Sequence, residues 1–182
     1  MDILLINPPT QIWATRNTAP LGLGYLAAVL ERQGHRVEIL DLMVERKSDA
    51  EVRKDISLMD MVGVTSTTPA VYNAYKICKV ARQEGVPVVM GGPHPSALPF
   101  ESLDECDLVV CGEGEETIVE VCKAVETGSS LKGIRGIVYR DDGTVVDARP
   151  RDFIRDLDSL PFPAWHLFPD IGPPLELPPE QE

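Results

Sequence analysis

The sequence is poor in positive charge and contains no long apolar run. Its 182 residues include 17 Lys and Arg against 29 Asp and Glu, for a net charge of −12. Nucleic acids and anionic membranes attract clustered positive charge, so we expect neither as a partner. A membrane span needs roughly 18 consecutive apolar residues, and a signal peptide begins with a positive segment; the sequence shows neither. These absences predict a cytoplasmic protein.

Cysteine is also scarce, and the spacings of the four cysteines match no zinc or iron–sulfur motif. They are Cys78, Cys106, Cys111 and Cys122. We expect them to be buried thiols in a reducing compartment. A chain of this length, with 43% hydrophobic residues, can bury roughly two-thirds of its unfolded surface and needs no disulfide or metal to fold. The composition therefore predicts one globular domain.

Short apolar runs alternate with helical patterns along the chain. Five runs read as buried strands, at residues 3–6, 37–41, 61–65, 86–90 and 107–111. Helical patterns cover 21–33 and 49–57, a third begins at a capping Thr68 and ends at Gly85, and a fourth begins near Glu115 and ends at Gly128. Such alternation predicts an α/β fold, a flavodoxin-like (Rossmann-like) three-layer sandwich with a five-stranded parallel sheet. Asp141-Asp142-Gly143 predicts a C-terminal β-hairpin between residues 134–139 and 144–146.

Four loops that follow the predicted strands are rich in glycine, proline and hydroxyl residues. In a parallel sheet all four lie on one rim, where α/β proteins bind their ligands. The glycines allow a bulky ligand to lie against the backbone, although tight turns alone would also explain them. The loops are Asn7-Pro8-Pro9, Thr65-Ser66-Thr67-Thr68, Gly91-Gly92-Pro93-His94 and Gly112-Glu113-Gly114-Glu115.

Known phosphate-binding and hydrolase motifs are absent. The first strand is not followed by Gly-x-Gly-x-x-Gly, and the sequence has no Walker motif and no nucleophile elbow. Glu113 and Glu115 would repel a pyrophosphate. The rim therefore predicts a large, mostly uncharged ligand rather than a dinucleotide.

Proline is concentrated at the C-terminal end, where 8 of the 16 prolines lie between residues 150 and 179. This composition is typical of a linker. We expect residues 1–149 to form the ligand-binding domain and residues 150–182 to form a proline-rich linker.

Taken together, these motifs resemble the N-terminal cobalamin-binding domain of cobalamin-dependent radical SAM proteins, a group that includes methyltransferases and the anaerobic ring cyclase of chlorophyll synthesis. The resemblance covers about residues 1–168. It rests on Leu4–Pro9, Pro20–Ala27, Gly91–Ser96, Gly112–Glu115 and Leu157–Trp165.

The resemblance implies that the chain binds cobalamin, with a radical SAM barrel in the same polypeptide as its partner. Asn7, Pro8 and Pro9 would face the corrin ring, and Ser66, Thr67 and Thr68 would offer hydroxyls to the nucleotide tail. The groove for that tail would be lined by Gly91, Gly92 and Pro93, with His94 beside it. The other side would be closed by Gly112, Glu113, Gly114 and Glu115. Trp165 is expected to pack the linker against the domain.

The sequence departs from related families in two ways. None of the three histidines lies in the Asp-x-His-x-x-Gly motif that supplies a lower cobalt ligand in the methionine-synthase type of domain, which implies a base-off state without a protein histidine. Ile12 or Trp13 is a candidate for the lower face instead. The Cys-x-x-x-Cys-x-x-Cys motif of radical SAM domains is also absent, so the [4Fe-4S] cluster and S-adenosylmethionine would belong to a domain outside this chain.

We therefore expect a corrinoid module that is not catalytic by itself and holds no metal through its own side chains. Two alternatives remain open. One is a small flavodoxin-like hydrolase or transferase that uses Glu113 or His94. The other is an interaction module that keeps the fold without a ligand.

Overall fold

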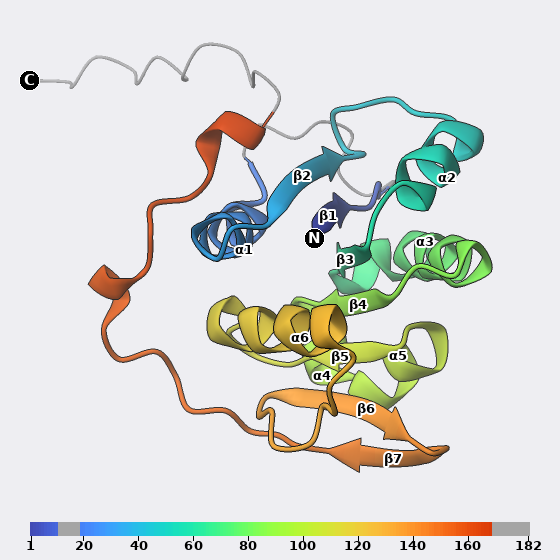
Figure 1. Ribbon diagram of the computed structural model, residues 1–182. Helices are drawn as coiled ribbons and strands as arrows, with labels where there is room; N and C mark the ends of the chain where they lie inside the picture. The colour runs from blue at the N-terminus through green and yellow to red at the C-terminus, as the bar shows by residue number, and fades with distance from the viewer. Residues whose placement is uncertain (11–18, 169–182) are drawn as a thin grey trace, which may run out of the picture.

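The computed structural model describes residues 1–10 and 19–168. Within them, seven strands form one mixed sheet in the order β2-β1-β3-β4-β5-β6-β7 (Figure 1). The first five strands in this order are parallel, and β6 and β7 are antiparallel to their neighbours. The strands are β1 (Asp2–Asn7), β2 (Arg36–Asp41), β3 (Met61–Thr65), β4 (Val88–Gly91), β5 (Leu108–Val110), β6 (Ile137–Asp141) and β7 (Thr144–Asp147).

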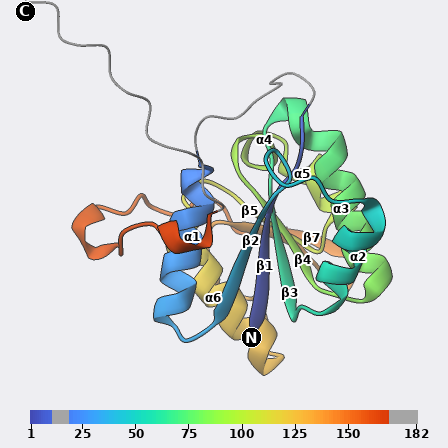
Figure 2. The same ribbon diagram turned by 90° about the horizontal axis from the view of Figure 1, so that it is seen from above.

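Helices cover both faces of the sheet, as the apolar runs predict. One face packs against α1 and α6, and the other packs against α2, α3 and α5 (Figure 2). The helices are α1 (Leu21–Arg32), α2 (Asp49–Ser57), α3 (Val71–Glu84), α4 (Pro93–Ala97), α5 (Pro99–Glu105) and α6 (Glu115–Thr127). Three-residue 3₁₀ turns lie at η1 (Thr68–Ala70), η2 (Leu157–Ser159) and η3 (Trp165–Leu167). The predicted three-layer α/β sandwich is confirmed.

The β-hairpin differs from the prediction in its place. It extends the sheet, because β6 pairs with β5 through Leu108, Val109 and Val110. Asp142 and Gly143 adopt positive φ angles of 46° and 80°, as a tight Asp-Gly hairpin turn requires. The sheet therefore has seven strands instead of five.

Two features between the strands were not predicted correctly. The connection from β4 to β5 contains α4 and α5, both with proline in the first turn, whereas the sequence offered no apolar periodicity there. Thr68 does not cap a helix through its hydroxyl: residues Thr68–Ala70 form a 3₁₀ turn, and α3 begins only at Val71.

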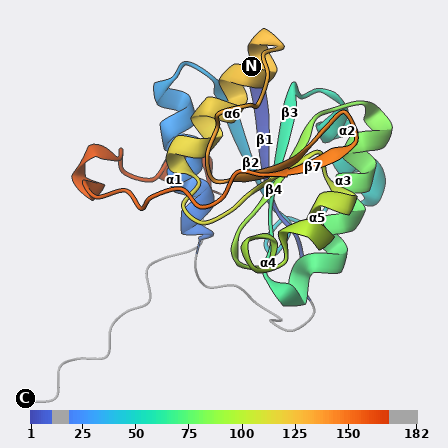
Figure 3. The ribbon, with the colours of Figure 1, turned by 90° about the horizontal axis from the view of Figure 1, so that it is seen from below.

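The segment after β7 is docked on the domain (Figures 1 and 3). The amide of Ala164 donates to the carbonyl of Gly24 in α1 at 3.0 Å, and the Phe168 ring packs against Gly24, where a Cβ would lie 3.0 Å from it. Trp165, expected to make this contact, is instead 56% exposed. Among the described residues, no helix combines the length and the hydropathy that crossing a membrane requires.

Candidate functional site

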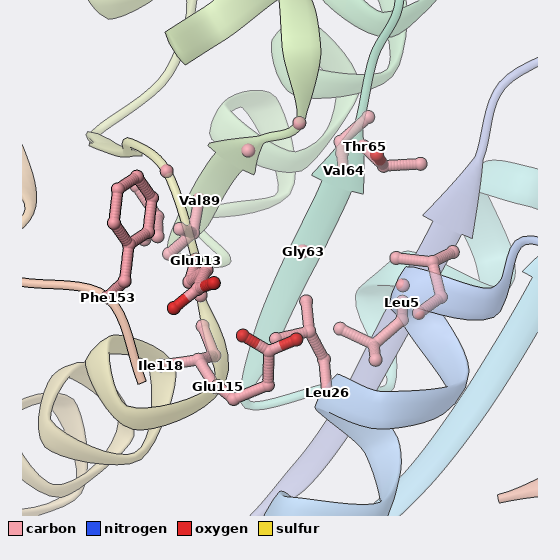
Figure 4. Close-up of a pocket in the computed structure, with 17 residues that line it drawn as sticks. Leu5, Leu26, Gly63, Val64, Thr65, Val89, Glu113, Glu115, Ile118 and Phe153 are labelled. Carbon is pink, nitrogen blue, oxygen red and sulfur yellow. The ribbon is translucent and has the colours of Figure 1, made fainter. Parts of the chain in front are cut away.

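A cavity of about 390 Å³ lies between the sheet and helices α1 and α6 (Figure 4). It opens near the carboxyl ends of the central strands, beside the point where the strand order reverses between β1 and β3. This is where α/β sheets place their ligands. The cavity is lined by Leu5, Gly22, Leu23, Leu26, Gly63, Val64, Thr65, Val89, Gly91, Gly92, Val110, Gly112, Glu113, Gly114, Glu115, Ile118 and Phe153.

The floor of the cavity includes a glycine in the middle of the central strand β3. Gly63 lies between Leu5 and Val89 in the register of β1, β3 and β4. A Cβ on Gly63 would lie 2.7 Å from Leu5 Cδ2, closer than carbon atoms pack. The Leu5 side chain thus takes the place next to Gly63, and the two residues form part of the cavity floor. No local sequence pattern pointed to Gly63.

Two adjacent glycines at the end of β4 have different reasons to be glycine. Gly92 has a φ of +99°, and a Cβ there would lie 2.7 Å from Thr65 Oγ1, so its backbone position excludes a side chain. A Cβ on Gly91 would meet only Val110, at 3.6 Å from its carbonyl oxygen. The fold therefore tolerates a side chain at Gly91, which would point into the cavity.

Two carboxylates from the loop before α6 and its first turn enter the cavity lining. Glu113 Oε2 accepts a hydrogen bond from the amide of Ile154 at 2.6 Å. Glu115 Oε2 is buried, and no group in the described part of the chain donates to it. No Lys or Arg is among the lining residues. The site is thus mainly aliphatic, with an unsatisfied acceptor.

Phe153 lines the cavity from the segment after the hairpin, although no sequence motif marks it as a site residue. Its ring is largely exposed, so no apolar periodicity could have identified it. The segment is held to α6 by Arg151, whose guanidinium bonds to Glu120 at 2.8 Å and to Glu116 at 2.9 Å. The hydrogen bond from Arg151 lowers the pKa of the Glu120 carboxyl, which keeps this ion pair charged at neutral pH.

Six of the fourteen predicted site residues line the cavity: Gly91, Gly92, Gly112, Glu113, Gly114 and Glu115. The others lie elsewhere on the same rim. Asn7 donates from Nδ2 to Asp41 Oδ1 at 2.7 Å, next to Pro8, and the carbonyl of Pro9 accepts from Asn73. Ser66 is buried and bonds to the carbonyl of Thr67. Pro93 is exposed in the first turn of α4.

His94 is buried on the opposite face of the sheet from the cavity. Its Nδ1 lies 3.1 Å from Thr68 Oγ1, and its Nε2 lies 3.4 Å from Tyr75 Oη. Burial raises the pKa of Tyr75 to about 12, so the phenol keeps its proton and donates to Glu101 at 3.0 Å. His94 thus ties α4 to the loop after β3. It does not meet Glu113, as a shared catalytic site would require.

The cysteines follow the expectation drawn from their spacing. All four are buried as free thiols. Burial raises the pKa of each, to about 11 for Cys111 and to about 12 for Cys106 and Cys122. Thiols with such pKa values stay protonated at neutral pH and are poor nucleophiles. Ile12 and Trp13, the candidates for the lower cobalt face, lie outside the described residues.

Comparison with known proteins identifies the family. Residues 14–122 match the model of the B12 binding domain, so the chain belongs to this family. The predicted resemblance to cobalamin-binding domains, and cobalamin as the cofactor of the family, are confirmed.

The relatives are longer proteins. The chain is 41% identical over 93% of its length to the uncharacterized methyltransferase PH0819 of Pyrococcus horikoshii. It is 32% identical over 92% of its length to the anaerobic magnesium-protoporphyrin IX monomethyl ester cyclase of Rubrivivax gelatinosus. It spans 39% and 33% of these two proteins, respectively.

A solved structure shows the same fold. It is the radical S-adenosylmethionine methyltransferase TsrM of Kitasatospora setae with cobalamin and a [4Fe-4S] cluster bound, which superposes with a TM-score of 0.70 at 27% sequence identity. The superposition covers 81% of this chain and 30% of TsrM.

Proposed function

We propose that this chain is the corrinoid-holding module of a cobalamin-dependent radical SAM enzyme, a methyltransferase or a cyclase. The observation that carries the proposal is the aliphatic cavity of about 390 Å³ at the carboxyl ends of the strands, in a chain of the B12 binding domain family. The relatives named as methyltransferases and cyclases support the choice of reaction class. Bound cobalamin supplies a cobalt centre that carries methyl groups or electrons.

The cavity fits the nucleotide tail of cobalamin. Gly91 leaves space that a Cβ would begin to fill, Gly63 forms part of the floor, and the walls include Leu26, Val89 and Ile118. A dimethylbenzimidazole base is flat and apolar, so burying it in this space is favourable. The glycine loops at Gly112 and Gly114 would then lie beside the tail where it leaves the cavity. The corrin ring would rest on the rim, near Asn7, Pro8 and Pro9 and near Ser66, Thr67 and Thr68.

We further propose that the cobalt receives no histidine from this chain. All three histidines are in the described residues, and none of them lines the cavity. His94 is engaged with Thr68 and Tyr75, and His166 pairs with Glu31 at 2.9 Å on α1. His35 lies 3.4 Å from the N-terminal amine. A corrinoid whose base is buried in the cavity would therefore be held base-off without imidazole.

The greater length of the relatives suggests how the functions are divided between the parts of the chain. We propose that residues 1–149 hold the corrinoid and that residues 150–182 lead toward a radical SAM barrel in cis, which would bind the [4Fe-4S] cluster and S-adenosylmethionine. The docked part of this linker, residues 150–168, contributes Phe153 to the cavity and so would couple the two parts. Neither Glu113 nor His94 is placed for the alternative hydrolase chemistry, because Glu113 bonds to Ile154 and His94 is buried apart from it.

Cobalamin retention by the full chain tests the proposal. The protein is mixed with hydroxocobalamin, desalted and examined by absorbance, and the reduced sample is examined by electron paramagnetic resonance. We expect about one corrinoid per chain and no nitrogen hyperfine splitting on the cobalt. Failure to retain cobalamin at micromolar protein would overturn the proposal, and nitrogen splitting would overturn its base-off part.

A further inference from the structure

The carboxyl group of Glu115 has one oxygen that is both buried and without a donor among the described residues. Buried polar atoms without partners are rare in proteins, because each forfeits its hydrogen bonds to water. Glu115 opens helix α6, and Figure 4 shows its carboxyl group between Ile118 and Leu26 in the cavity. An unsatisfied acceptor at this position indicates a ligand that brings a hydrogen-bond donor.

The surroundings of Glu115 restrict what that donor can be. Among the residues that the structure describes, the cavity lining contains a second carboxylate, Glu113, and no cation, so these side chains repel the phosphate of a nucleotide tail. A dimethylbenzimidazole base attached through one ring nitrogen carries no N–H group and offers only a lone pair. Within the nucleotide itself, which is the part that cobinamide lacks, the donors are the free hydroxyls of the ribose.

We propose that Glu115 accepts a hydrogen bond from a ribose hydroxyl of the nucleotide tail and thereby selects complete corrinoids over cobinamide, which lacks this tail. The inference rests on the proposed function and assigns a role to one residue of that site. Glu115 is a specificity-determining residue, and the free protein carries it at a cost in stability. Binding of the tail relieves that cost, because the desolvated oxygen gains its missing partner.

The test compares cobalamin and cobinamide on the full chain by absorbance titration. Glu115→Leu replaces the acceptor with an apolar side chain that suits the cavity, and Glu115→Gln keeps an acceptor oxygen. The matched control is Glu126→Gln, which removes one charge from an exposed residue in the last turn of the same helix, outside the cavity lining and away from Arg151. Thermal unfolding of the ligand-free proteins is recorded in parallel.

We expect Glu115→Leu to weaken cobalamin binding about tenfold or more, as loss of a hydrogen bond to a charged group does, and to leave cobinamide binding within twofold of wild type. Glu115→Gln should retain most of the affinity, and Glu126→Gln all of it. Ligand-free Glu115→Leu should melt at or above the wild-type temperature, an effect that a merely structural role of Glu115 would reverse.

Three outcomes would overturn the inference while leaving the proposed function standing. They are unchanged cobalamin affinity in Glu115→Leu, an equal loss for both corrinoids, and a lowered melting temperature in the ligand-free variant. If wild-type protein binds neither corrinoid, the proposed function fails, and this inference fails with it.

Discussion

A side chain introduced at Gly91 should weaken cobalamin binding without lowering the free energy of unfolding. In the unliganded protein a Cβ at this position meets Val110 at 3.6 Å from its carbonyl oxygen and 3.9 Å from its Cβ, both ordinary contacts. Gly91→Val therefore introduces no backbone strain, and valine suits a strand better than glycine does. We expect the free energy of unfolding to stay within about 0.5 kcal/mol of wild type or to rise.

Cobalamin binding responds differently, because the isopropyl group occupies space that the nucleotide tail needs. Forcing extra methyl groups into a filled site costs about 1–3 kcal/mol, which corresponds to roughly 5- to 150-fold in affinity. Gly92→Val cannot serve as this probe. A side chain there collides with Thr65 and strains the backbone whether or not a ligand is present.

The assay combines urea unfolding of the free protein with absorbance titration by hydroxocobalamin. Ala97→Val serves as the control, because Ala97 is exposed at the end of α4 and does not line the cavity. Wild-type affinity in a normally folded Gly91→Val protein would refute the assignment of the cavity to the tail. A lower free energy of unfolding in the same variant would refute the claim that the unliganded fold has room for a side chain at Gly91.

Three further predictions concern Phe153, Arg151 and His94. Phe153→Ala should weaken cobalamin binding by a few-fold and leave unfolding unchanged, because the ring is exposed until a ligand packs against it; equal affinities in titration would contradict this. Arg151→Met should speed amide exchange at Ile154 and cost less than about 1 kcal/mol of stability, as expected for a partly exposed ion pair. Acid should act in the same direction, because Arg151 lowers the pKa of Glu120. The stabilisation is present above the unfolded pKa of this carboxyl and is lost as pH falls through the folded value. His94→Ala should cost about 1–3 kcal/mol in urea unfolding, since it leaves a cavity in place of a buried imidazole and removes its contacts with Thr68 and Tyr75. It should leave the absorbance spectrum of bound cobalamin unchanged, and a shifted spectrum would place His94 at the cobalt.

The fold was predictable from sequence wherever one pattern had one structural meaning. Fully apolar runs such as Ile3–Ile6 can be buried on both faces only in a covered sheet, and glycines such as Gly85 and Gly128 end helices through positive φ angles. The β4 to β5 connection carried no such pattern. Its two short helices begin at prolines and are held by tertiary contacts, including the one from His94 to Thr68.

The site divides in the same way. Glycines and acids at the strand ends and in the loops after them, such as Gly91 and Glu113, could be assigned to one rim, because parallel strands bring their carboxyl ends to one edge. Rim residues share a cavity only if their side chains point to the same face of the sheet. No sequence pattern gave this direction for His94, which lies on the opposite face from the cavity.

The sequence by itself determined the fold class, the family and the rim that carries the loops, because these follow from local pattern and motif. Only the tertiary structure decided where the cavity lies and what completes it. Gly63 forms part of the floor without a side chain because Leu5 on β1 leaves no room for one, and Phe153 reaches the wall because Arg151 fastens its segment to α6. Both effects join residues far apart in the chain, and no local pattern records such contacts.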